Sequence, residues 1–125
     1  MERLYSKVAL IQNHNHRFFI NEQPYPSYLY LEQPWPKVRA LPNFCSEVIH
    51  QCMTGQVGPR GLPAKKPTEF VANHPALLEP LKPIKCDGFH QHDSLESNGG
   101  ERCKLWTWQL ASLVVDGISL LKEAL

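Results

Sequence analysis

Apolar residues recur at the spacing of an amphipathic helix in two parts of the sequence. Leu4, Val8 and Ile11 alternate with charged and polar residues, which predicts a helix over residues 2–14. A longer stripe predicts a second helix over residues 106–124, and its members are Leu110, Leu113, Val114, Ile118 and Leu121. The apolar face of the first helix needs a partner, because such a face is normally buried against another element.

Short apolar runs between these two helices predict strands. The predicted strands cover residues 17–21, 47–51 and 69–72. Nine of the eleven prolines lie between residues 24 and 75, so long regular elements are not expected there. A broken helix is predicted over residues 28–41. A short helix is predicted over residues 74–83, with Pro75 at a favoured first-turn position.

The alternation of helices and short buried strands predicts an α/β fold whose sheet runs mostly parallel. Three short strands make a thin sheet, because a complete doubly wound domain has more strands. A chain of 125 residues is long enough for one small domain and too short for two. We therefore interpret residues 1–125 as one small domain that forms part of a larger one.

The composition excludes several classes of protein. Hydrophobic residues make up 42% and charged residues 20%, and the net charge of +1 creates no global field for nucleic acid or membranes. No apolar run approaches the roughly 18 residues that a membrane span needs. Charged and polar residues interrupt the first nine positions, unlike a signal peptide. We expect an intracellular protein, cytoplasmic or nuclear and not secreted, with cysteines as reduced thiols.

The segment KCDGFHQH places three metal-binding side chains, Cys86, His90 and His92, within seven residues. Thiolate and imidazole are preferred zinc ligands, and histidines two residues apart point the same way in an extended segment. A structural zinc ion has four ligands, and Cys103 is the predicted fourth. The alternatives for that position are Cys52, Cys45 and a water molecule. The other interpretation is a polar loop whose histidines cap a helix or form local hydrogen bonds.

The glycine- and proline-rich segment 55–67 is predicted to be a loop that carries three cations. Arg60, Lys65 and Lys66 are candidates for contacts with the phosphates of a nucleic acid. A solvated loop without a ligand is the simpler interpretation, because three cations are a weak signal.

Two cysteines and two tryptophans are expected to have structural roles. Cys45 and Cys52 have no evident base and helix terminus beside them, so we interpret them as small buried residues rather than nucleophiles. Trp106 and Trp108 precede the last helix and are interpreted as core or domain-contact anchors rather than as platforms for base stacking.

Several short motifs follow one another in an order that resembles a known arrangement. They are RFFINEQP, then HQCMTG and AKKPTEFVAN, then CDGFHQH, and finally a helix that begins WTWQL. The order is similar to the C-terminal half of divergent cytosine-5 DNA methyltransferase-like proteins of phages and of retrotransposon polyproteins in algae and protists. In that family the sequence runs from an E-N-P-like motif through a D-Q-C-x-x-G-like turn and a K-P-T strand to a C-x-G-x-H-x-H loop.

The resemblance covers about residues 10–120. It implies a partial Rossmann-like methyltransferase sheet with a Cys/His-rich loop and a C-terminal helix. It also implies that Glu22 is the catalytic carboxylate, which in the family hydrogen-bonds the flipped cytosine. The alternatives for Glu22 are an exposed glutamate at a strand end and the remnant of a former site.

The chain departs from the family pattern in two substitutions and two missing motifs. Gln23 stands in place of asparagine and His50 in place of aspartate. The glycine-rich loop for S-adenosylmethionine and the Pro-Cys nucleophile motif lie upstream in the family and do not occur here. The chain is therefore not expected to methylate alone, and S-adenosylmethionine is expected only with an upstream half.

Three hypotheses for function follow. The first is a methyltransferase-like fragment from a mobile element or virus, with a DNA-related role and no catalysis of its own. The second is a small Cys/His-rich binding or interaction module stapled by zinc. The third is a stand-alone enzyme that uses Glu22 with a histidine. The predicted partners are DNA, an upstream methyltransferase half or a second copy of the chain, and no membrane. If the chain is part of a larger sheet, the face of Leu4, Val8 and Ile11 should be exposed.

Overall fold

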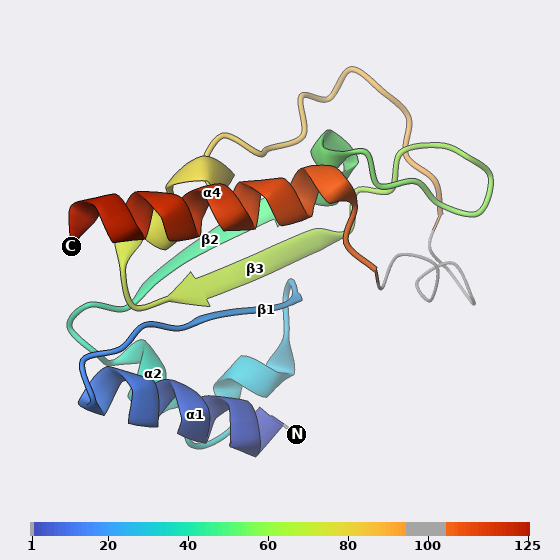
Figure 1. The fold of residues 1–125 in the computed structure, drawn as a ribbon. Coiled ribbons are helices and arrows are strands. Elements are labelled where there is room, and N and C mark those ends of the chain that lie inside the picture. Colours follow the sequence, from blue (N-terminus) through green and yellow to red (C-terminus); the bar gives the residue numbers. More distant parts are fainter. Residues whose placement is uncertain (1, 95–104) are drawn as a thin grey trace.

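The structure, a computed structural model, describes residues 2–94 and 105–125 and stacks three layers (Figure 1). Its elements are α1 (Glu2–His14), β1 (Ile20–Pro24), η1 (Tyr28–Leu31), α2 (Trp35–Arg39), β2 (Cys45–His50), η2 (Gln51–Thr54), β3 (Pro67–Ala72), η3 (Pro75–Leu77), η4 (Glu79–Leu81) and α4 (Trp108–Ala124). A three-stranded sheet forms the middle layer. Helix α4 covers one face of the sheet, and α1 and α2 cover the other (Figure 1).

The sheet has the strand order β1-β3-β2, and both pairings are antiparallel. The mixed α/β fold with a C-terminal helix is confirmed, whereas the expectation of a mostly parallel sheet is wrong. The reason is the path between β2 and β3. Residues 51–66 turn back at the end of the sheet where β2 finishes, so β3 starts there and runs in the opposite direction (Figure 1).

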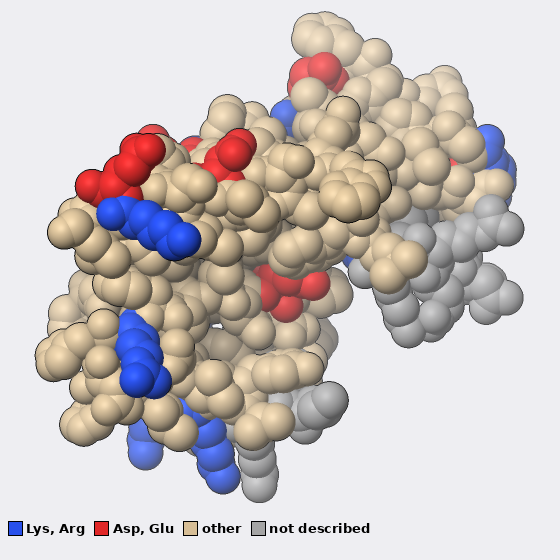
Figure 2. All heavy atoms as spheres, viewed as in Figure 1, with Lys and Arg blue, Asp and Glu red and all other residues tan. Residues whose placement is uncertain are grey.

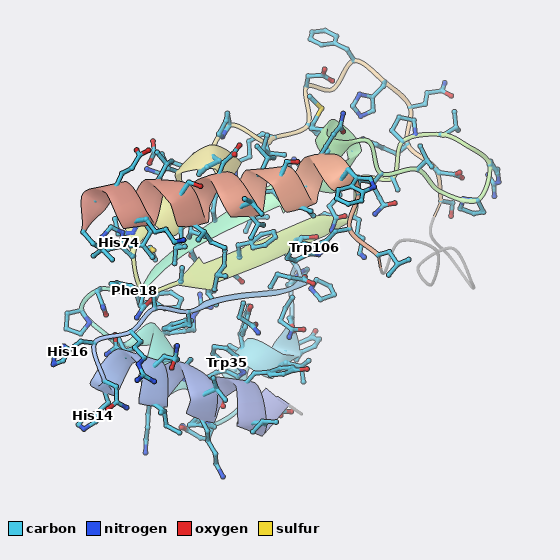
Figure 3. The ribbon with its side chains drawn as sticks, in the orientation of Figure 1. His14, His16, Phe18, Trp35, His74 and Trp106 are labelled. Atoms are coloured by element: carbon cyan, nitrogen blue, oxygen red, sulfur yellow. The ribbon has the colours of Figure 1, made fainter. Side chains whose placement is uncertain are left out.

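The central strand β3 contributes side chains to two separate cores. Phe70 and Ala72 face α4 and belong to a cluster with Ile49, Leu110 and Val114. Val71 points to the opposite face of the sheet. There it belongs to the second core cluster, with Ala9, Tyr30, Trp35 and Val38. Figure 3 shows Trp35 in this second layer, between the sheet and α1. This alternation follows from the period of two in a strand, and it makes β3 buried on both faces.

Helix α1 confirms the predicted range and also the predicted exposure of its apolar face. Leu4, Val8 and Ile11 are 55%, 46% and 58% exposed. The helix instead buries the small side chains of Ser6 and Ala9. Small residues allow the helix backbone to lie close to the layer beneath it. Among the described residues, no helix combines the length and apolar character that crossing a membrane requires.

Three local predictions need correction. The first strand begins at Ile20 rather than at residue 17. The helix predicted over residues 74–83 is instead two short 3-10 turns, η3 and η4, because Pro80 interrupts the segment. Trp106 packs its ring 5.8 Å from that of Phe70, whereas Trp108 is 89% exposed. A core role is therefore wrong for Trp108, and a domain-contact role stays a prediction.

We expect Gly117→Ala to destabilise the packing of α4. A Cβ added at Gly117 would overlap the carbonyl oxygen of Leu77 in η3, so the helix would have to move away. The expected loss in the free energy of unfolding is about 1–3 kcal/mol, measured by urea denaturation. Ser119→Ala is the matched control, because Ser119 is exposed on the same helix. Equal midpoints for the two variants would contradict this close contact.

Candidate metal centre

Four potential metal ligands converge beyond the end of β2. The Sγ atoms of Cys52 and Cys86 and ring nitrogens of His90 and His92 all lie within 4.8 Å of one another. Cys52 comes from η2, and the other three come from the segment 85–93, which passes beside η2 (Figure 1). Two thiols and two imidazoles at this separation could hold a metal ion.

The individual distances describe a compact group of ligand atoms. Cys86 Sγ lies 3.7 Å from His90 Nε2 and 3.4 Å from His92 Nε2. The two Nε2 atoms are 3.0 Å apart, and the imidazole rings meet edge to face at an interplanar angle of 89°. Both rings therefore direct the same nitrogen toward one point beside the sulfur.

Asp87 orients the first of these histidines. Its Oδ1 lies 3.2 Å from His90 Nδ1 and also accepts a hydrogen bond of 2.9 Å from the backbone N–H of Phe89. Gly88, at φ +77°, makes the tight turn that brings these groups together. A carboxylate at Nδ1 keeps the proton on that nitrogen and leaves the lone pair on Nε2 for a metal.

His50 and Lys85 hold the start of the segment against β2. The backbone N–H of Cys86 donates to His50 Nδ1 at 2.7 Å. Burial lowers the pKa of His50, and the charges of Lys65, Lys85 and His92 lower it further, so the ring is neutral and accepts this bond at pH 7. Lys85 Nζ pairs with Glu47 at 2.8 Å and donates to the carbonyl of Val48. The position of Cys86 is thus set from the end of the strand.

Cys52 is presented by the short turn that directly follows β2. Gly55, at φ +80°, ends this turn, and the N–H of Gln51 donates to the carbonyl of Lys65 at 2.7 Å. Burial raises the pKa of Cys52 to about 11, and the thiol of Cys86 contributes to the rise. The sulfur therefore keeps its proton at pH 7 without a metal, and a bound cation would displace that proton.

Asp93 anchors the other end of the segment to the loop that follows η2. Its N–H donates to the carbonyl of Pro63 at 2.8 Å, and its Oδ2 accepts from the N–H of Arg60 at 2.6 Å. The carboxylate is fully buried, and a Cβ at Gly58 would overlap it. Residues 86–92 are therefore fixed at both ends, at His50 and at Asp93.

The predicted cluster is assembled in part as expected. Cys86, His90 and His92 come together, and the fourth member is Cys52, which was an alternative to Cys103. Cys103 lies outside the described residues. Cys45 lies elsewhere, on β2, where its Sγ donates to the carbonyl of Ala72. The sequence signal that could have favoured Cys52 is its place in HQC, directly after a predicted strand.

The other predicted site residues lie away from the cluster or at its border. Glu22 is on β1, where it lines a hollow with Trp106 and Phe70. Arg60 and Lys65 are exposed on the loop beside the cluster, and Lys66 is half-buried. Glu22 therefore has no contact with the candidate metal ligands.

Comparison with known proteins identifies no relative. No protein-family model matches the chain, and neither a curated protein nor a solved structure does. The relationship to cytosine-5 DNA methyltransferase-like proteins stays a prediction. A function can therefore be proposed only from the arrangement of the side chains.

Proposed function

We propose that Cys52, Cys86, His90 and His92 bind one Zn²⁺ ion and that the protein is a small zinc-stapled binding or interaction module. The carrying observation is the convergence of four ligand atoms within 4.8 Å. Zinc–ligand bonds of about 2.0–2.3 Å place the donors of a tetrahedron roughly 3.3–3.8 Å apart. The two sulfur–nitrogen distances of 3.4 and 3.7 Å fall in that range, and the nitrogen pair at 3.0 Å is slightly closer.

The donor set favours a structural ion over a catalytic one. Two thiolates and two neutral imidazoles neutralise the charge of Zn²⁺ and fill all four positions of a tetrahedron. A catalytic zinc site normally keeps one position for water or substrate. The carboxylate of Asp87 at Nδ1 of His90 is the outer support that zinc-bound histidines usually have.

Residues 85–92 need such a staple because they have little packing of their own. No side chain in this range is buried. Phe89 is 91% exposed, so the largest apolar group of the segment contributes nothing to a core. A bound ion would join the segment to η2 and would supply the stability that apolar contacts do not provide.

A DNA-related role is the second candidate, and the position of two cations favours it. Arg60 and Lys65 are both exposed on the loop that borders the cluster, and the Nε of Arg60 lies 3.9 Å from Oδ1 of Asp93. This is the role implied by the resemblance to methyltransferase-like proteins, in which Glu22 would be catalytic and an upstream half would bind S-adenosylmethionine. The antiparallel sheet adds no support to that resemblance, because doubly wound sheets are mostly parallel.

The purified protein is expected to contain about one equivalent of zinc, measured by elemental analysis. Free zinc at 100 times its Kd should stabilise the fold by about 2.7 kcal/mol. For a chain of this size that corresponds to a rise in Tm of roughly 10 °C. Cys86→Ser should lose both the bound zinc and the zinc-dependent rise in Tm. Cys45→Ser is the control, because Cys45 is also a partly buried thiol but lies outside the cluster.

Cobalt substitution identifies the ligands directly. Co²⁺ in a tetrahedral site with two thiolates gives visible absorption and a thiolate charge-transfer band, and both should weaken in Cys52→Ser and in Cys86→Ser. Zinc below a tenth of an equivalent in both the purified and the zinc-reconstituted protein would rule out the metal.

Asp87→Ala is expected to weaken zinc binding by about 10–100-fold without removing a ligand. The loss follows because His90 would no longer have a carboxylate at Nδ1 to hold its ring. Competition with a chromophoric chelator measures the affinity. Glu79→Ala serves as the control, since it removes an exposed carboxylate that forms an ion pair with Lys82. Equal affinities for the two variants would contradict the role of Asp87.

If Arg60 and Lys65 contact phosphates, the double variant Arg60→Gln/Lys65→Gln should bind DNA more weakly. The slope of log affinity against log salt should then fall by about 0.9 for each lost contact with double-stranded DNA and by about 0.7 with single-stranded DNA. Fluorescence anisotropy with single- and double-stranded DNA measures both quantities. Lys7→Gln/Lys37→Gln is the matched control, since these exposed lysines lie on α1 and α2. Equal slopes for the two double variants would exclude this phosphate site.

A further inference from the structure

A row of hollows follows the outer edge of β1. The first, of about 320 Å³, lies between β1 and α1 and includes Leu4 and Val8. The second, of about 300 Å³, includes Glu22 and Trp106. The third, of about 230 Å³, lies between the start of β1 and α4, at Ile118. Ile20 lines all three, so they form one groove along the strand, which we call the β1 groove.

The groove exists because the two helical layers border the edge of the sheet. Side chains of α4 line it from one side and side chains of α1 from the other. Figure 2 shows this face hollowed between the layer of α4 above and the layer of α1 below, with acidic atoms at the hollow. In the space between them, β1 has no neighbouring strand on its outer side among the described residues.

Main-chain N–H and C=O groups of β1 point toward that outer side. Tyr25 donates its N–H to Pro67 in β3, and the Oδ1 of Asn73 accepts from the N–H of Phe19. Inward and outward groups alternate along an antiparallel strand, so the N–H and C=O groups of Ile20 and Glu22 face outward. Outward donors and acceptors at the spacing of a strand are a template for another strand.

The side chains along the groove define what such a strand would carry. Apolar groups of α1 and α4 form its two walls, and Glu22 is the single charged residue among those that line the three hollows. Ile20 packs on the α4 side, and Glu22 lies on the same face two positions later, near Phe70 and Trp106. A fitting strand therefore has apolar residues on both faces and one basic residue opposite Glu22.

We propose that the β1 groove binds an extended segment of another polypeptide, which adds a fourth strand beside β1 and places a lysine or arginine against Glu22. Main-chain pairing supplies the affinity, and the alternating side chains supply the specificity. A second copy of this chain fits less well, because it would bring a second Glu22 and a second pair of bordering helices into the same groove. DNA is disfavoured by the carboxylate at the centre of the groove. This inference is independent of the proposed zinc site.

The capped peptide Thr-Lys-Val-Ile-Val-Ser is the probe, because it carries one basic residue followed by three consecutive apolar residues, which point to both faces of a strand. We expect it to bind the full chain with a Kd of about 1 mM or tighter, measured by NMR titration. The amide protons of Ile20 and Glu22 should become protected from hydrogen exchange. A peptide N-methylated at alternate residues keeps the side chains but cannot pair, and it should bind at least about tenfold more weakly.

A charge exchange tests the contact with Glu22. Glu22→Lys should weaken the binding of the lysine peptide. The variant should instead bind the peptide Thr-Glu-Val-Ile-Val-Ser about tenfold more tightly than it binds the lysine peptide. Glu22 is half-exposed, and an amide spectrum that is unchanged away from β1 would show that the variant folds. The proposal would be overturned if the lysine peptide fails to bind the natural chain and the glutamate peptide fails to bind the variant. It would also be overturned if the N-methylated peptide binds as tightly as the lysine peptide, or if hydrogen exchange at Ile20 and Glu22 does not change. A dimer through β1, or single-stranded DNA that competes for the groove, would overturn it as well.

Discussion

The double pairing of β3 is the interaction on which the rest of the structure depends. This strand accepts β1 on one side and β2 on the other, and it sends Phe70 and Val71 into opposite cores. A side chain on one face packs under α4, and its neighbour packs under α1 and α2. Asn73, which is buried directly after β3, holds the segment that leads into β1. Its side-chain oxygen accepts a hydrogen bond from the N–H of Phe19, and its side-chain nitrogen donates one to the carbonyl of Arg17. Both helical layers are positioned through one ladder of hydrogen bonds.

The candidate metal centre lies where this packed structure ends. Beyond β2 the chain enters η2, and the segment 85–93 returns to the same place with no buried side chain before Asp93. Its position rests on polar contacts at His50 and Asp93, and the four ligand atoms meet between these anchors. The proposed metal ion would suit such a region, because a few coordinate bonds can replace a core that a short exposed segment cannot form.

The cluster and the β1 groove are separate in chemistry and in position. The cluster combines soft ligands with an outer carboxylate, features that suit a structural ion. The groove combines apolar walls, one carboxylate and the outer edge of β1, which has no neighbouring strand among residues 2–94 and 105–125, and these features suit an extended peptide. The two proposals together describe a binding module, in which Glu22 and the imidazoles of the cluster lie in separate places.

Local sequence by itself determined the two long helices and the loop that carries three candidate metal ligands. Each of these depends on residues a few positions apart, so the periodicity and spacing are visible in the chain. Only the tertiary structure decided the antiparallel direction of the sheet, the choice of Cys52 in the cluster and the groove beside β1. These features depend on the path of residues 51–66, which returns the chain to the same end of the sheet and joins residues that are distant in sequence. No local pattern encodes such a path, because it is set by how the two cores pack on the faces of β3.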